Sequence, residues 1–238
     1  MKKVIVFLSF IFLLVGCGKK SDEIVMVTEA GFAPYEFYEN GEVIGVDIEI
    51  SKKIADKLGK KLVIKDVAFD SIINELNSGK ADFAAAGMSI NPERSEKVDF
   101  SIEYITSNQV VVVKKDSDIK SIDDIKDKRI SVQLGTVADT YVTKNYKDAK
   151  INRLKKFLVA AEDVKNNKSD CIVMDAIPAN ELVKSNPELK VLDGMLFQDK
   201  YGMAVKKGNK ELLNSINLVL EELIKDGKID EYIIKFSE

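Results

Sequence analysis

Arg94 occupies an unusual place for a cation, within the stretch AGMSINPERSEKVDFS of residues 86–101. An apolar run ends at Ser89, and Asn91-Pro92 then predicts a helix start, with Asn91 as N-cap and Pro92 in the first helical position. Arg94 falls in the first turn, where a positive charge opposes the helix dipole at a cost of about 0.3 kcal/mol. Two alternatives follow: a solvated surface side chain, or a site that holds an anion.

The elements that would position such a site alternate between strands and helices. The predicted strands cover residues 23–30, 61–68, 81–88, 108–115, 128–135, 150–157, 169–176 and 201–207. The predicted helices cover residues 46–59, 70–79, 137–146, 159–167, 178–186, 211–227 and 229–236, with a short capping-box helix after Ser121. This alternation indicates an α/β protein with largely parallel sheets covered by helices. Two such units, each too small to be the whole protein, indicate two lobes with a cleft between them.

Ligands of open α/β sheets bind just beyond the carboxyl ends of the strands. The polar and aromatic residues at those ends are therefore the candidates for chemistry. They are Glu29 and Phe32, Phe69 and Asp70, Gly87 to Ser89 with Arg94, Gln133 to Thr136, and Asp175.

Several kinds of chemistry are excluded by composition. The chain has no histidine, which excludes His-dependent triads and His-ligated zinc. It has no P-loop, GxGxxG or GxSxG motif, so we expect no cofactor and no metal. Of the two cysteines, Cys171 lies in the apolar run CIVM and is expected to be a small buried hydrophobe. The charges are well mixed, without a basic stripe, which argues against a nucleic-acid partner.

The N-terminus has the pattern of a targeting segment. Lys2 and Lys3 precede an apolar run of residues 4–16, which is shorter than the roughly 20 residues that a transmembrane helix needs. The run ends in Leu14-Val15-Gly16-Cys17, which resembles the bacterial lipobox, in which the cysteine is lipidated. We therefore expect a signal peptide at 1–16 and a palmitate-bearing Cys17 with a linker at 17–22. The mature chain, with 34 basic and 39 acidic residues, would have a net charge of −5.

Most of the mature chain resembles the extracytoplasmic amino-acid-binding proteins of ABC importers, which include the lysine/arginine/ornithine- and glutamine-binding proteins. The motifs that carry the resemblance are GFAPYEF, GVDIEISKKIA, FDSIINELNSGKAD, AGMSINPERSEKVDFS, SVQLGT and the aspartate of CIVMDA. The resemblance implies a two-lobed periplasmic-binding-protein fold of type II, each lobe a mainly parallel sheet flanked by helices, with a hinge and a ligand cleft. The first lobe would comprise residues 23–108 and 200–238, and the second residues 109–199.

The resemblance also implies ligand contacts. Arg94 would clamp the α-carboxylate of an amino acid, and Asp175 would bind its α-ammonium group. Since these two residues would lie in different lobes, only a closed cleft would satisfy both ends of the ligand. Asp175 could also act as N-cap of the following helix. The backbone N–H groups of Ser89, Thr136 and Val137 would complete the anion site. The Gly87 carbonyl and the Ser89 hydroxyl would assist Asp175. Phe32 and Phe69 would enclose the ligand side chain, with Met88 as a further ligand-binding residue.

Glu29 and Gln133 would face the ligand side chain. An acid near two aromatic rings suits a guanidinium or ammonium group, so the expected ligand is arginine or lysine, with glutamine or another polar amino acid next. The expected product is a monomeric, non-enzymatic, lipid-anchored protein outside the cytoplasm that delivers the amino acid to a membrane permease. The alternatives are a lyase on the same fold, similar to cyclohexadienyl dehydratase, and a sensory domain.

Overall fold

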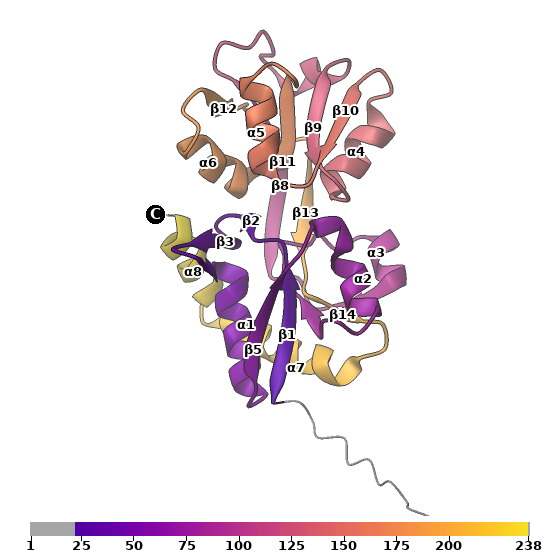
Figure 1. The fold of residues 1–238 in the computed structure, drawn as a ribbon, viewed down its shortest axis with the longest axis vertical. Coiled ribbons are helices and arrows are strands. Elements are labelled where there is room, and N and C mark those ends of the chain that lie inside the picture. The colour runs from indigo at the N-terminus through magenta and orange to yellow at the C-terminus, as the bar shows by residue number, and fades with distance from the viewer. Residues whose placement is uncertain (1–21, 238) are drawn as a thin grey trace, which may run out of the picture.

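The computed structural model describes residues 22–237. The expected signal peptide and Cys17 lie outside the described residues. Among the described residues, no helix combines the length and apolar character needed to cross a membrane. Figure 1 shows two lobes stacked along the long axis of the molecule.

The first lobe is built on a sheet with the strand order β5-β1-β6-β14-β7. Its strands are β1 (Glu23–Thr28), β5 (Lys61–Asp66), β6 (Phe83–Ala84), β7 (Val98–Phe100) and β14 (Ala204–Lys206). Strands β5, β1 and β6 pair in parallel, whereas β14 is antiparallel to β6 and β7. The predicted parallel units are therefore present, with antiparallel strands added at one side.

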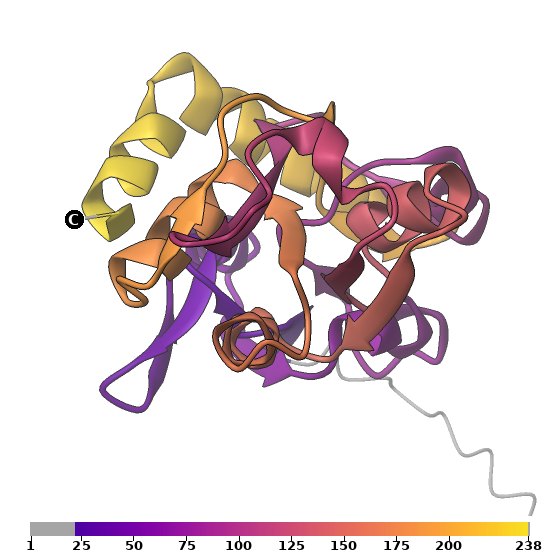
Figure 2. The same cartoon turned by 90° about the horizontal axis from the view of Figure 1, so that it is seen from above.

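Helices cover both faces of this sheet because the side chains of β1 alternate between them. Ile24 and Met26 share a hydrophobic cluster with residues of α1 and α7, whereas Val27 packs with Ile72 and Leu76 of α2. The helices of this lobe are α1 (Val46–Lys57), α2 (Ile72–Asn77), α3 (Pro92–Lys97), α7 (Lys210–Lys225) and α8 (Lys228–Ser237), with a 3₁₀ turn η1 (Phe69–Ser71) before α2. Figure 2 shows α7 and α8, in yellow, at the periphery of the molecule.

The second lobe contains a sheet with the order β10-β9-β11-β8-β12, and β13 also pairs with β8. Its strands are β8 (Ile105–Lys114), β9 (Arg129–Gln133), β10 (Lys150–Leu154), β11 (Cys171–Asp175), β12 (Leu189–Val191) and β13 (Phe197–Tyr201). Its helices are η2 (Ile122–Ile125), α4 (Val137–Asn145), α5 (Phe157–Lys165) and α6 (Ala176–Lys184). All five residues of β11 are buried, as expected for a central strand with helices on both faces, and Cys171 is fully buried as predicted.

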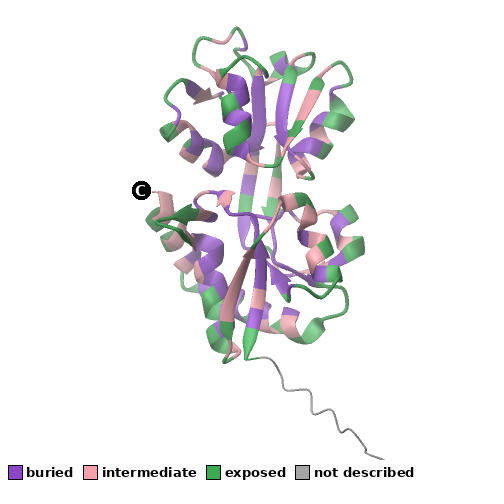
Figure 3. Ribbon diagram, in the orientation of Figure 1, coloured by how far each residue is buried: buried purple, intermediate pink, exposed green. Residues whose placement is uncertain are grey.

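Two antiparallel strands, β8 and β13, run between the lobes (Figure 1). The expected lobe boundaries, after residues 108 and 199, fall inside these two strands. The fold class predicted from the sequence is confirmed, whereas the division at these residue numbers stays a prediction. Figure 3 shows buried residues along the central strands of both lobes and across the region where the lobes meet.

Two strand predictions were wrong in extent. The apolar run 81–88 forms a strand only at Phe83–Ala84, and Gly87 then takes a left-handed conformation with φ of 49°. The predicted strand 201–207 is two elements, because β13 ends at Tyr201 in the second sheet and β14 begins at Ala204 in the first. An antiparallel ribbon of β2 (Gly31–Phe32), β3 (Glu36–Glu39) and β4 (Glu42–Ile44) was not predicted.

This ribbon caps α1 through its backbone. The N–H groups of Val46 and Asp47 donate to the carbonyls of Pro34 and Tyr35, each at 3.0 Å, so the helix start is satisfied without a capping side chain. The close contact between the ribbon backbone and the start of α1 requires Gly45, whose φ of 131° and ψ of −178° are accessible essentially only to glycine. A Cβ at Gly45 would lie 2.2 Å from the Tyr35 carbonyl oxygen.

We expect Gly45→Ala to lower the free energy of unfolding by about 3 kcal/mol or more, because the added Cβ meets backbone atoms that cannot move alone. Gly41→Ala is the matched control: Gly41 also has a positive φ, of 86°, but a Cβ there meets nothing within 4 Å. The control should cost about 1–2 kcal/mol. Urea unfolding of both variants measures the difference, and equal losses would contradict the close approach.

Candidate functional site

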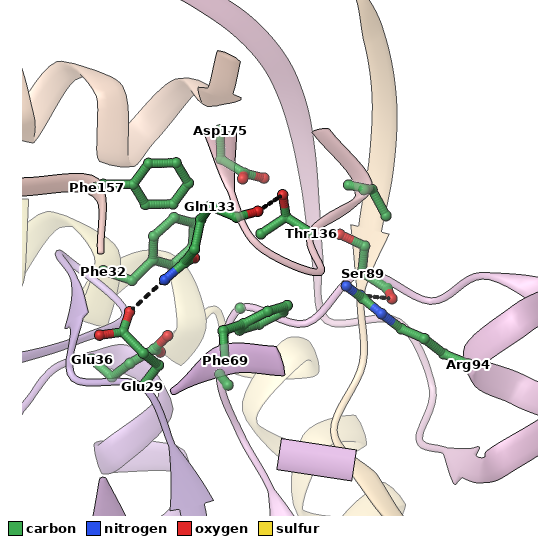
Figure 4. Close-up of a pocket in the computed structure, with 13 residues that line it drawn as sticks. Glu29, Phe32, Glu36, Phe69, Ser89, Arg94, Gln133, Thr136, Phe157 and Asp175 are labelled. Atoms are coloured by element: carbon green, nitrogen blue, oxygen red, sulfur yellow. Dashed lines mark hydrogen bonds between the residues drawn. The ribbon is translucent and has the colours of Figure 1, made fainter. Parts of the chain in front are cut away.

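A cavity lies between the lobes, at the carboxyl ends of β1, β9 and β11. It is lined by Glu29, Phe32, Glu36, Phe69, Ala86, Gly87, Ser89, Arg94, Gln133, Thr136, Val137, Phe157 and Asp175. Of the residues expected to contact the ligand, all but Met88 line it, whereas the strand-end candidate Asp70 does not. The Met88 side chain instead packs in the core of the first lobe with Val27 and Ile72. Figure 4 shows Arg94 at one end of the cavity and Glu29 and Glu36 at the other.

Arg94 is held in place by the predicted helix start. Asn91 caps α3 by accepting a hydrogen bond from the Arg94 backbone N–H at 2.8 Å. The guanidinium group donates from Nη1 to the Ser89 carbonyl at 2.6 Å and from Nη2 to the Gly135 carbonyl, in the second lobe, at 2.9 Å. Its central carbon lies 5.2 Å from the centre of the Phe69 ring, a cation–π distance.

The Arg94 charge has no anion bonded to it. The residue is only 7% exposed, and within residues 22–237 no carboxylate forms an ion pair with it. Burial lowers the pKa of Arg94 to about 10, opposed by the more distant charges of Asp199 and Asp175. Two of its five N–H donors are used, so the others remain for a ligand. The solvated alternative is thereby wrong for this side chain.

Asp175 lies at the end of β11 and is buried. It occupies the N-cap position of α6, but its side chain makes no capping hydrogen bond. Instead, its Oδ1 accepts hydrogen bonds from the hydroxyl of Ser107, at 2.7 Å, and from the hydroxyl of Tyr201. Burial, followed by repulsion from Asp199, raises the pKa of Asp175 to about 6. Hydrogen bonds from Tyr201, Ser107 and Gln109 oppose this rise by stabilising the carboxylate.

Asp199 was missed by the sequence analysis because β13 was not predicted. Its carboxylate accepts hydrogen bonds from the Ser89 hydroxyl and from Gln109 Nε2, the latter at 3.3 Å. The Ser89 hydroxyl, expected to assist at the ligand's ammonium group, is thus engaged by Asp199. Burial raises the pKa of Asp199, while the hydrogen bond from Ser89 lowers it.

Glu29 is 2% exposed and binds groups of the second lobe. Its Oε2 accepts a hydrogen bond from Gln133 Nε2 at 2.9 Å. The ammonium group of Lys156 lies 3.2 Å from Oε1, an ion-pair distance, yet Oε1 accepts no hydrogen bond in the described part of the chain. Burial raises the pKa of Glu29, against the opposing effects of Gln133 and Lys156.

Glu36, on β3, is a second buried carboxyl group in the cavity that the sequence analysis missed. It is 1% exposed, and its Oε2 has no hydrogen-bond partner among residues 22–237. Burial and the nearby Asp47 raise the pKa of Glu36 well above its usual range. The available signal was a lone acid between the aromatic residues Tyr35 and Phe37 of the GFAPYEF motif.

Aromatic rings form the cavity wall. Phe32 stacks on Phe157 of the second lobe, with centroids 5.7 Å apart and an interplanar angle of 26°. Phe157, at the start of α5, was not among the predicted residues. Gly87 makes room for Phe32, because a Cβ at Gly87 would lie 2.6 Å from the ring.

Thr136 and Val137 form the start of helix α4. The Thr136 hydroxyl caps this helix by accepting a hydrogen bond from the Asp139 N–H at 3.2 Å, and Val137 is its first residue.

The lobes are closed on each other. Polar contacts join them around the cavity: Arg94 to the Gly135 carbonyl, Glu29 to Gln133 and Lys156, and Asp70 to Lys155, the last with oxygen–nitrogen distances of 2.9 and 2.8 Å. The closed cavity combines a buried cation at one end with buried carboxyl groups elsewhere in its wall. Such a site is suited to binding a small molecule that carries charges of both signs.

Comparison with known proteins identifies the family. The model of the bacterial extracellular solute-binding proteins, family 3, matches residues 24–238. The chain belongs to this family. It is 33% identical over 213 residues to ABC transporter arginine-binding protein 1 of Escherichia coli (strain K12), covering 87% of both chains.

Solved structures of this family agree with the fold. An ancestral arginine-binding protein bound to arginine matches with a TM-score of 0.85 and 42% identity, over 90% of this chain and 98% of the other. A structure of an ancestral arginine-binding protein bound to glutamine matches with a TM-score of 0.86 and 41% identity, over 92% and 99% of the two chains. These family-3 relatives are named as binding proteins, and the chain is a binding protein of this kind rather than an enzyme.

The hydroxyl of Tyr201 should control the protonation of Asp175. Because its hydrogen bond stabilises the carboxylate, Tyr201→Phe should raise the pKa of Asp175 further above about 6. A carboxyl ¹³C NMR titration measures this shift, with Tyr38→Phe as control, since Tyr38 donates to the distant Asp66. An Asp175 pKa that stays or falls in Tyr201→Phe would refute this role.

Proposed function

We propose that this family-3 protein captures an α-amino acid by closing its lobes around it. The observation that carries the proposal is the buried Arg94 guanidinium, which has no ion-pair partner among residues 22–237, in the same cavity as Asp175. The ligand carboxylate would bind Arg94 of the first lobe, and the ligand ammonium group would bind Asp175 of the second. Because each lobe supplies one charge, a zwitterion favours the closed state by its differential affinity for it.

The far end of the cavity favours a cationic side chain. Glu29 Oε1 and Glu36 Oε2 are buried acceptors without hydrogen bonds among the described residues, and a guanidinium group supplies several N–H donors. Phe32 and Phe69 offer ring faces to the ligand. We therefore propose arginine as the preferred ligand, in agreement with the names of the arginine-binding relatives, followed by lysine and then by glutamine or another polar amino acid.

The amino acid would be delivered to the permease of an ABC transporter. The lipobox-like LVGC sequence supports a lipid anchor at Cys17, which would hold the binding domain, as a monomer, at the outer side of the cell membrane. The family's description as extracellular supports that location.

A thermal-shift screen of residues 22–238 against the common amino acids tests the proposed ligand. Binding stabilises the folded state by about 2.7 kcal/mol at a hundredfold excess over the dissociation constant, so arginine should give the largest shift in Tm, followed by lysine. Calorimetry then ranks the affinities. Equal binding of leucine and arginine would refute the cationic preference, and absence of a shift with every amino acid would refute the function.

Arg94→Ala should weaken amino-acid binding by at least about tenfold without unfolding the protein, because it removes the carboxylate partner. Arg129→Ala is the matched control, since Arg129 pairs with Asp170 on the surface of the second lobe. Asp175→Asn should also weaken binding by removing the partner of the ammonium group. Calorimetry measures each affinity, and full affinity in Arg94→Ala would disprove the carboxylate clamp.

A further inference from the structure

The ammonium group of Lys156 occupies the position beside Glu29 that the side chain of a cationic ligand would need. It is the residue before α5, and its ammonium group lies 3.2 Å from Glu29 Oε1. Glu29 is 2% exposed, whereas the Lys156 side chain is 44% exposed. The charge of Glu29, the candidate partner of a ligand guanidinium, is therefore already balanced in the closed structure.

An outer groove lies beside the Lys156 side chain. Lys156 lines an outer groove bordered by Tyr38 and Leu158, while Glu29 lines the inner cavity. Phe32 and Phe157 line both, so their stacked rings separate the groove from the cavity. The Lys156–Glu29 pair thus spans this wall, and the lysine can withdraw to the groove without crossing the cavity.

The pair is a single contact. The Lys156 ammonium group lies 3.2 Å from Oε1, and its attraction to Glu29 raises the pKa of Lys156 against the effect of burial. A lysine makes one such contact, whereas a guanidinium can make two parallel hydrogen bonds to one carboxylate. A ligand guanidinium is therefore able to displace the Lys156 ammonium group from Glu29, but it must compete with it.

We propose that Lys156 determines whether the cavity prefers a charged or an uncharged ligand side chain, because its ammonium group competes with cationic ligands for Glu29. While Lys156 is paired with Glu29, the subsite is close to neutral and accepts an uncharged polar side chain. When Lys156 withdraws to the outer groove, Glu29 is available to an arginine or lysine side chain. The inference rests on the proposed amino-acid binding and names the residue that tunes its selectivity.

Arginine and citrulline form the deciding pair of probes, because citrulline has nearly the same shape but a neutral ureido group. Lys156→Met should raise the ratio of arginine affinity to citrulline affinity by at least about tenfold, since the competing charge is removed. Lys155→Met is the matched control: the neighbouring Lys155 also joins the lobes, but it pairs with Asp70. That control should leave the ratio within about twofold, even if closure weakens. Calorimetry on residues 22–238 gives both affinities for each variant.

A double-mutant cycle with Glu29→Gln tests whether Lys156 acts through Glu29. In the Glu29→Gln background, Lys156→Met should change the ratio far less than tenfold, because no carboxylate holds the lysine beside the cavity. An unchanged ratio in Lys156→Met, or an equal rise in Lys155→Met, would overturn the inference while leaving amino-acid binding intact. If the wild-type domain binds neither probe nor any other amino acid, the proposed function fails and the inference fails with it.

Discussion

The guanidinium group of Arg94 carries a full charge in a site that is only 7% exposed, and this constraint shapes the surrounding structure. A buried ion without a counter-ion costs several kcal/mol, and two backbone carbonyls and the Phe69 ring offset only part of that cost. Negative charge is concentrated nearby, where the carboxylates of Asp175 and Asp199 repel each other. The closed lobes thus contain charges of both signs that are not in contact, and a zwitterion of suitable length would compensate them together.

The sequence predicted the parts of this site that depend on local chemistry. The Asn91 cap orients Arg94 as expected. Glu29 follows β1 of the first sheet, and Gln133 and Asp175 end β9 and β11 of the second, so all three lie at the carboxyl ends of strands. These features are encoded within a few residues of each side chain. The alternation of strands and helices likewise predicted the two lobes.

Features that depend on pairing between distant segments were not predicted. A single apolar run at 201–207 gave no indication that β13 and β14 belong to different sheets, so Asp199 was not seen to reach Ser89. Glu36 points into the cavity because β3 pairs with β2 in a particular register, and a shift of one residue would direct it outward. Lys156 and Phe157 act on the first lobe only because the lobes are closed, an arrangement of the whole chain that no local pattern specifies.

The two strands that cross between the lobes also supply hydrogen-bond partners to residues of the cavity wall. Ser107 and Gln109 belong to β8, Asp199 and Tyr201 belong to β13, and Ser107 and Asp199 are partners in the ladder between them. Hydrogen bonds from this ribbon reach Asp175, which lines the cavity, and Asp199 of the ribbon itself. These donors lower the pKa of Asp175, against the effect of burial. The ribbon between the lobes and the buried Asp175 carboxylate thus form one hydrogen-bonded unit, which couples the position of the ribbon to the acidity of that carboxylate.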